Sequence, residues 1–251
     1  MISATVSYMR FEVARQFRNR DAVLFRLGLP AGLYVVFRAV ISSGSDGTSE
    51  GLPSDVAAMV AFAVFGALYS TVFASGPPLA KERAIGWLRQ LRVTPLPAGI
   101  AVAGKVAAAM AFALPSIALV ALAAALTQDV RLGVDRWLEL TAVIWLAAAV
   151  FTALGVLIGL AVRNPEVAQS ATSAALIVMW LFGGLVTSPS NLPAVLETLA
   201  DGMPPNAAGE LGWAAARGDA LPLWAVAVLA VWTVVLSLLS VLAWRKRAQA
   251  Q

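Results

Sequence analysis

Long runs of apolar residues, each close to the length of a bilayer-spanning helix, are the feature of this sequence that most restricts its fold. A helix needs about 20 predominantly apolar residues to cross the hydrocarbon core of a bilayer. Only 13% of the residues are charged, whereas a soluble domain carries about 25%. We therefore predict an all-α polytopic membrane protein, in which residues 1–251 form a single transmembrane domain with six transmembrane helices at about residues 22–43, 56–75, 98–126, 138–162, 167–187 and 222–244.

Residues 4–20 precede the first of these spans and have the pattern of an amphipathic helix. Val6, Met9, Val13 and Phe17 recur at helical spacing among four arginines. A helix of this kind lies along the membrane surface with its apolar face among the acyl chains. We predict an interfacial helix here, and the alternative is a soluble basic tail.

Residues 188–221 are neither a span nor an ordinary loop. Four prolines divide them into short, mildly apolar pieces: Pro189, Pro193, Pro204 and Pro205. Because proline interrupts a helix, this pattern predicts short re-entrant helices that dip partly into the outer leaflet before the last span.

Lysine and arginine are concentrated on one side of the predicted bundle. With six spans both termini lie on that side, together with the loop at residues 77–97. The side with the termini contains Arg10, Arg15, Arg18, Arg20, Lys81, Arg83, Arg89, Arg92, Arg163 and residues 245–247, and the other side contains Arg131, Arg136 and Arg217. Since cytoplasmic loops of membrane proteins carry the excess of basic residues, we expect both termini and residues 77–97 to be cytoplasmic.

The segment at residues 77–97 is strongly charged and lies between two apolar spans. Pro77 and Pro78 precede its charged part, and Pro95 and Pro97 follow it. We read these prolines as helix boundaries, which predicts a short cytoplasmic helix at about residues 79–93 that is separate from its neighbours. Such a helix could be the contact site for a partner protein that supplies energy. In the simpler alternative it is a basic segment that only fixes the orientation of the chain in the membrane.

Several chemistries are excluded by the residues that the chain lacks. It has no cysteine and no histidine, which rules out thiolate metal sites and histidine-dependent hydrolases. It has no G-x-x-x-x-G-K-[ST] motif for binding ATP, and its acidic residues lie in predicted loops or near span ends. We therefore predict no catalytic and no metal site in this chain, and an energy source in a partner.

Aromatic residues recur along the second predicted span, at Phe62, Phe65, Tyr69 and Phe73, on or near one helical face. The simpler interpretation is ordinary helix packing. The functional interpretation is the lining of a cavity for a lipophilic substrate, and the sequence leaves both open.

The loop between the second and third spans resembles that of the permease subunits of type-two ABC exporters. The pattern of that family is E-R-x-x-G-[T]-L-x-x-L-x-x-T-P-L, followed by G-K. This chain has the corresponding residues Glu82, Arg83, Gly86, Leu88, Leu91, Thr94, Pro95, Leu96, Gly104 and Lys105. A second similarity lies toward the outer segment, at Gly183-Gly184, Leu192-Pro193 and Pro204-Pro205.

The resemblance implies that the loop is a coupling helix docking on a separate ATPase subunit. The residues expected at this contact are Glu82, Arg83, Gly86, Trp87, Leu88 and Leu91. The chain departs from the family at Trp87, where a small Thr is common, and at Arg89, where an acid is frequent.

The resemblance also implies an assembly of two permeases, identical or related, on two ATPase subunits that bind ATP and Mg. This chain would hold no cofactor and bind no nucleic acid. The expected activity is export of a small lipophilic drug, antibiotic or lipid-like molecule across the bacterial cytoplasmic membrane by alternating access. The residues expected along the substrate path are Phe65, Tyr69, Phe73, Trp180 and Phe182. The alternatives are a membrane assembly or binding subunit that transports nothing and, less well supported, a membrane enzyme.

Overall fold

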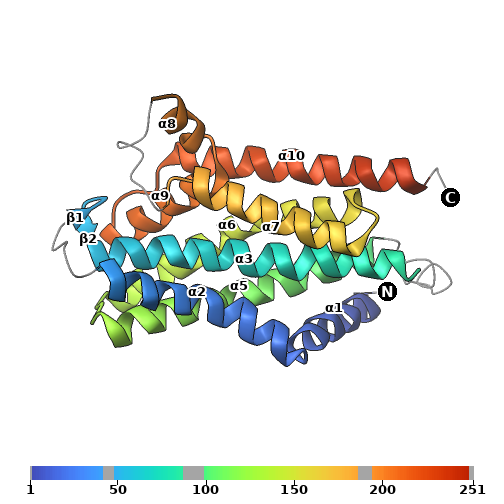
Figure 1. Cartoon of the computed structure of the whole chain (residues 1–251), viewed down its shortest axis with the longest axis horizontal. Helices are drawn as coiled ribbons and strands as arrows, with labels where there is room; N and C mark the ends of the chain where they lie inside the picture. Colours follow the sequence, from blue (N-terminus) through green and yellow to red (C-terminus); the bar gives the residue numbers. More distant parts are fainter. Residues whose placement is uncertain (1, 42–47, 87–98, 186–193, 249–251) are drawn as a thin grey trace.

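Long apolar helices arranged side by side make up most of the protein (Figure 1). The computed structural model describes residues 2–41, 48–86, 99–185 and 194–248. Five helices in these ranges are long and apolar enough to cross a membrane: α2 (Arg20–Ile41), α3 (Ser54–Ala84), α5 (Ile100–Thr127), α6 (Val134–Ala161) and α10 (Leu223–Ala248). Strands in the described ranges are limited to a two-stranded hairpin, β1 (Thr48–Ser49) and β2 (Leu52–Pro53). This confirms the all-α polytopic membrane fold.

The fifth predicted span corresponds to α7 (Pro165–Phe182), which is not among those five helices. Its 18 residues extend about 27 Å at 1.5 Å per residue, but its first half carries Glu166, Gln169, Ser170 and Ser173. Asn164 caps its start by accepting a hydrogen bond from the backbone N–H of Glu166 at 2.8 Å. The count of six spans therefore stays a prediction.

Helix α3 is the centre of the bundle, and α2, α5, α6, α7 and α9 all pack against it. Its packing against α6 is close because α6 presents glycine to it. A Cβ added to Gly159 would lie 2.7 Å from the carbonyl oxygen of Gly76 and 2.9 Å from Cβ of Leu79. Such short distances show that the two backbones approach as closely as glycine permits.

Helix α3 also corrects one prediction. Pro77 and Pro78 do not begin a separate helix, because α3 continues through them to Ala84. A proline inside a helix leaves the carbonyl four residues earlier without its usual donor, which for Pro78 is the carbonyl of Ala74. In the structure this oxygen accepts a hydrogen bond from Nε2 of Gln16 at 3.1 Å. A donor from another helix thus replaces the missing bond, and α3 continues.

Helix α1 (Ile2–Phe17) precedes α2 and is joined to it by a turn at Arg18-Asn19. Its buried side carries Glu12 and Gln16, whereas Val6 is exposed. Of the apolar positions from which we predicted an interfacial helix, Val6 is therefore available to lipid, Met9 and Val13 are partly exposed, and Phe17 stacks on Phe112 of α5. The interfacial position itself remains a prediction.

Two short helices, α8 (Ala194–Asp201) and α9 (Pro204–Arg217), lie in the proline-rich segment. Helix α9 is almost fully buried, and Nε1–H of its Trp213 donates to the backbone oxygen of Ala57 on α3 at 3.1 Å. The described segment thus contains short helices as predicted, and their re-entrant placement in a membrane remains a prediction.

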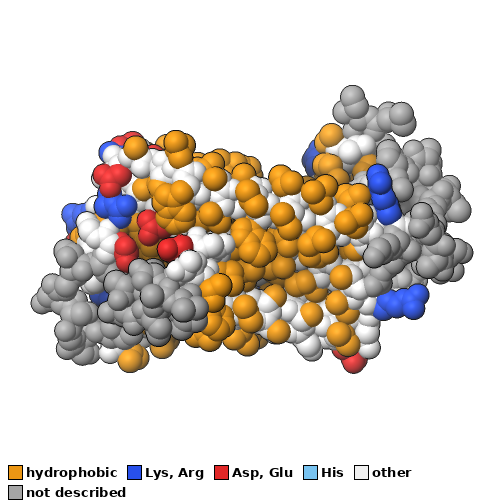
Figure 2. All heavy atoms as spheres, turned by 90° about the horizontal axis from the view of Figure 1, so that it is seen from above, with side chains coloured by type: hydrophobic (Ala, Val, Ile, Leu, Met, Phe, Trp, Pro, Cys, Tyr) orange, Lys and Arg blue, Asp and Glu red, His pale blue; other side chains and the backbone are white. Residues whose placement is uncertain are grey.

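The surface of the bundle has the character expected of a membrane protein. Figure 2 shows hydrophobic side chains over the middle of the face in view, with charged side chains gathered toward the ends. Both chain termini lie at one end of the bundle, and the β1–β2 hairpin lies at the other (Figure 1).

Candidate functional site

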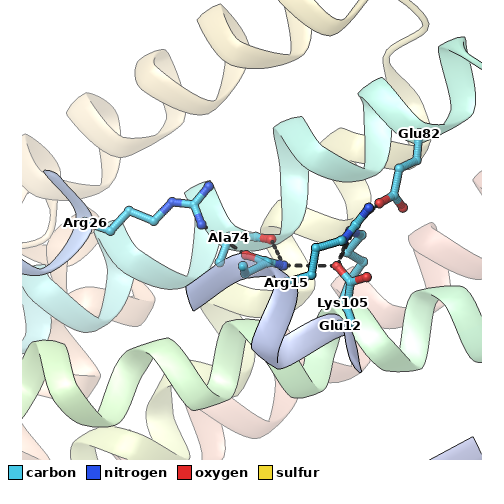
Figure 3. Close-up of polar contacts among 7 residues, drawn as sticks. Glu12, Arg15, Arg26, Ala74, Glu82 and Lys105 are labelled. Carbon is cyan, nitrogen blue, oxygen red and sulfur yellow. Dashed lines mark hydrogen bonds and ion pairs between the residues drawn. The ribbon is translucent and has the colours of Figure 1, made fainter. Parts of the chain in front are cut away.

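A cluster of four charged side chains, three of them buried, connects three helices at the end of the bundle that carries the termini. Lys105 on α5 is completely buried and contacts the carboxylates of Glu12 on α1 and Glu82 on α3, the second at 2.7 Å. Arg15 on α1 contacts both carboxylates as well, Glu12 at 2.9 Å. Figure 3 shows these side chains pointing toward one another. Two carboxylates and two cations make the cluster electrically neutral.

The pKa shifts of the cluster members outside the spans follow from this arrangement. Burial would raise the pKa of Glu12, but the ammonium of Lys105 and the guanidinium of Arg15 outweigh burial and hold that pKa below its usual 4.5. Burial would lower the pKa of Arg15, but the carboxylates of Glu82 and Glu12 outweigh burial and raise that pKa. Both side chains are therefore charged at neutral pH, and the cluster acts as an ionic tie between helices.

Gln16 extends the cluster toward α2. Its amide nitrogen lies 3.4 Å from the Glu12 carboxylate, and its amide oxygen accepts a hydrogen bond from Arg26 at 3.0 Å. The guanidinium of Arg26 lies 5.4 Å from the ring centroid of Phe112, on which Phe17 also stacks at 4.1 Å. Helices α1, α2, α3 and α5 are thus joined by one polar network with an aromatic edge.

The residues predicted for coupling are placed in three different ways. Glu82 is 5% exposed and belongs to the buried cluster, so it faces the bundle interior. Arg83 donates to the backbone oxygens of Gly159 and Leu160 at the end of α6, at 2.7 and 2.6 Å. Gly86 follows the end of α3 with φ of +77°, a left-handed conformation that favours glycine. The remaining predicted residues, Trp87, Leu88 and Leu91, lie outside the described residues.

A second candidate site is a cavity of about 580 Å³ between α2, α3 and α7, near the end with the hairpin. Most of its lining is apolar and aromatic, and a few polar groups stand at its edge. The lining residues are Leu33, Val36, Phe37, Arg38, Val40, Glu50, Ser54, Ala57, Ala58, Ala61, Phe62, Phe65, Trp180, Gly184, Leu185 and Trp213. A cavity of this size and composition suits a small lipophilic molecule.

The aromatic residues predicted for the substrate path have three different placements. Phe65 and Trp180 come from different helices, lie 4.5 Å apart between ring centroids and line the cavity together. Tyr69 and Phe73 continue the row along α3, with centroid distances of 5.9 Å from Phe65 to Tyr69 and 4.8 Å from Tyr69 to Phe73. Phe182 is 38% exposed and is not part of the lining.

Charged groups also gather at the end of the bundle with the hairpin. Arg38 on α2 is buried and contacts Asp55 at the start of α3. On α9, burial and the carboxylates of Glu50 and Asp201 raise the pKa of Glu210 above its usual 4.5, although Arg217 opposes them. Among the described residues no group of three or more acidic side chains is arranged to hold a metal ion.

Comparison with known proteins identifies the kind of membrane protein. Residues 4–211 match the family described as ABC-2 type transporter. The chain belongs to the ABC-2 type transporter family. A relative from Bacillus subtilis (strain 168), named "Putative transport permease YvfS", is 27% identical over 213 residues, which cover 85% of each chain. This chain is thus a multi-pass membrane permease subunit of an ABC transporter, and the family implies an ATPase partner.

Some residues of these sites were not among the predicted ones. The residues missed in this ABC-2 permease are Glu12, Arg15 and Lys105 in the ion cluster, and Phe37 and Trp213 among the aromatic residues of the cavity lining. A signal for the cluster does exist in the sequence. Glu12 is the single acid of the basic stretch at residues 4–20, and Lys105 is the single charge of α5.

Proposed function

We propose that this ABC-2 permease is the membrane subunit of a bacterial exporter that moves a lipophilic drug, antibiotic or lipid-like molecule out of the cell. Two ATPase subunits bind ATP and Mg and drive alternating access in a pair of permeases. The observation that carries this proposal is the aromatic cavity between α2, α3 and α7, in which Phe65 and Trp180 lie 4.5 Å apart. Stacked and tilted rings offer a lipophilic molecule large contact areas without demanding one polar group.

The coupling half of the proposal rests on the end of α3. Glu82 joins this end to α1 and α5, and Arg83 joins it to the end of α6. The segment that follows, which contains Leu88 and Leu91, is therefore continuous with a helix that contacts most of the bundle. A displacement of this segment by an ATPase is therefore transmitted through α3 to the helices that line the cavity.

The orientation in the proposal is that both termini face the cytoplasm, where the ATPase works. The termini lie at one end of the bundle (Figure 1). Three basic residues lie at or beside the end of α3 on that side: Arg15, Lys81 and Arg83. Since a basic excess marks the cytoplasmic side, this supports the orientation. In the proposed orientation the aromatic cavity lies toward the outer leaflet.

The test is to co-express the permease with its cognate ATPase, to purify the complex in nanodiscs, and to measure ATP hydrolysis with a panel of lipophilic drugs. Transport is then measured in sealed vesicles. Trp180→Ala removes a cavity wall, and Phe182→Ala is the matched control because that ring is outside the lining. We expect Trp180→Ala to raise the half-maximal drug concentration about five- to tenfold, which is the loss of about 1–1.4 kcal/mol of ring contact.

Leu91→Asp tests the coupling segment in the same complex. We expect this change to dissociate the ATPase, while a change of the exposed Lys81 to Gln leaves the complex intact. A permease that purifies without ATPase, or that moves no lipophilic compound with or without ATP, would contradict the exporter function and favour a non-transporting assembly subunit.

A further inference from the structure

A second large hollow lies at the end of the bundle that carries the termini, away from the aromatic cavity. It has a volume of about 670 Å³ and lies between α1, α5 and α10. Helices α5 and α10 both pack against α6, and Leu160 of α6 is part of the hollow's lining. We call this hollow the terminal groove, and its lining is Met9, Gly99, Val102, Ala103, Val106, Ala107, Leu160, Ser240, Val241, Trp244 and Arg245.

The walls of the terminal groove are apolar and partly exposed. Val106 is 38% exposed and Val241 is 48% exposed, although both belong to helices that are apolar enough to span a membrane. Ser240 offers little polarity, because its hydroxyl donates to the backbone oxygen of Leu236 at 2.8 Å. The groove therefore presents an apolar surface whose contact with an acyl chain is more favourable than its contact with water.

One end of the groove is basic. Arg245 lines it from the last turns of α10, next to Trp244, and Lys246 and Arg247 follow in the sequence. Arg245 has no ion pair with any of the described residues and is exposed. A tryptophan and an arginine at the end of a spanning helix occupy the headgroup level of a bilayer. An apolar groove that ends at this level in an arginine without an ion pair among the described residues complements a molecule with an apolar tail and an anionic head.

We propose that the terminal groove binds an anionic phospholipid of the leaflet on the side of the termini. One acyl chain lies on Val102, Val106 and Val241, and the phosphate pairs with Arg245. Basic pockets between spanning helices bind acidic lipid headgroups for the same physical reason. The site is separate from the cavity between α2, α3 and α7, and it does not depend on which molecule is transported or in which direction.

The lipid would also have a structural effect. The groove includes Met9 of α1, the helix that supplies Glu12 and Arg15 to the ion cluster. A lipid on Met9, Val106 and Val241 connects α1 and α5 with α10, and α10 contributes no residue to the ion cluster. We therefore expect the anionic lipid to stabilise the permease as well as to bind to it.

The experiment is to purify the full chain, exchange it into nanodiscs of phosphatidylcholine with a low fraction of phosphatidylglycerol, and count retained lipids by native mass spectrometry. We expect phosphatidylglycerol to be retained in preference to phosphatidylcholine. Arg245→Gln should reduce this preference about fivefold, which corresponds to about 1 kcal/mol for one basic residue near anionic lipid. The matched control is Arg163→Gln, which removes an exposed arginine at the turn between α6 and α7, outside the groove lining.

Val106→Trp fills the groove without changing charge, and it should reduce retention of both lipids. Size-exclusion profiles and circular dichroism establish whether each variant is folded. If Val106→Trp is not folded, Arg245→Gln, which lies on the exposed end of α10, still tests the proposal. Equal lipid preference in Arg245→Gln and the native chain would overturn the proposal, and so would an equal loss in Arg163→Gln.

A second copy of the chain is the competing occupant of the groove. Because the chain has no cysteine, Val106→Cys introduces a single thiol in its wall. A disulfide-linked dimer of this variant in membranes would mean that another copy covers the groove, and it would overturn the lipid assignment. If the Val106→Cys variant stays monomeric and its thiol is labelled by a lipid-soluble maleimide, the result supports the lipid assignment.

Discussion

Replacing Lys105 by methionine removes the central cation of the ion cluster while keeping most of the side-chain volume. Lys105 is completely buried and is shared by Glu12 and Glu82. Without it two carboxylates depend on Arg15 alone, whose side chain is 41% exposed, and one negative charge is left uncompensated in the bundle. Removing one partner of a buried ion pair costs about 3–5 kcal/mol. For a chain of this length that corresponds to a fall in melting temperature of about 6–20 °C.

The assay is thermal unfolding of the purified permease in one detergent, followed by fluorescence-detected size exclusion. Lys81→Met is the matched control, because Lys81 is an exposed lysine next to Glu82 in the sequence, and we expect it to change stability by no more than about 0.5 kcal/mol. The double variant Lys105→Met/Glu82→Gln restores neutrality, since Glu12 then pairs with Arg15, and should recover part of the loss. Equal melting temperatures for Lys105→Met and Lys81→Met would refute the view that the cluster ties the helices together.

Three further predictions concern other parts of the permease. Because the pKa of Glu210 is raised, the folded protein favours the protonated carboxyl. This contribution to stability is present below the unfolded pKa of about 4.5 and is lost as pH rises through the folded pKa. The uncharged variant Glu210→Gln should therefore have a higher melting temperature than the native chain at pH 7 and the same melting temperature at about pH 4. Gly159→Ala should destabilise the protein because the new methyl group would lie 2.7 Å from a backbone oxygen of α3, whereas Gly28→Ala, with nothing within 4 Å inside the chain, should not; melting curves of the two variants compare them. Arg83→Gln should lower stability by about 2 kcal/mol through lost charged hydrogen bonds to α6, and it should also weaken drug-stimulated ATP hydrolysis; unchanged melting would show that these bonds are not maintained in solution.

The long apolar helices could be predicted from the sequence because a bilayer imposes a length and a composition on each span. The proline prediction was wrong for a reason that local sequence does not contain. Whether Pro78 breaks a helix depends on a donor for the Ala74 carbonyl, and that donor is Gln16, 58 residues away. The loss of the backbone hydrogen bond can be predicted from the proline in the sequence. The donor that replaces it can be identified only from the tertiary structure.

The two candidate sites differ in how much of them was predictable. Spacing along one helix placed Phe65, Tyr69 and Phe73 in one row, as the ring distances show. Trp180 and Phe182 were predicted together because the family resemblance implies that the fifth span lies near the substrate path. The two residues are two positions apart in a helix that turns about 100° per residue, so their side chains lie on nearly opposite faces of α7. Only Trp180 therefore reaches the cavity. The pairing of Glu12 with Lys105, 93 residues apart, depends on the packing of α1 against α5.

The end of α3 shows how the ion cluster and the proposed coupling are related. Glu82 and Arg83 are neighbours in a helix, so their side chains leave the axis about 100° apart. One contacts Lys105 and Arg15, and the other contacts the last carbonyls of α6. Rotation of α3 about its axis would break one set of contacts before the other, whereas movement of the whole helix end would carry α1, α5 and α6 with it. In the proposed exporter, a displacement of the segment after Gly86 therefore moves these helices together with α3 and changes the opening of the cavity that Phe65 lines at the other end of the same helix.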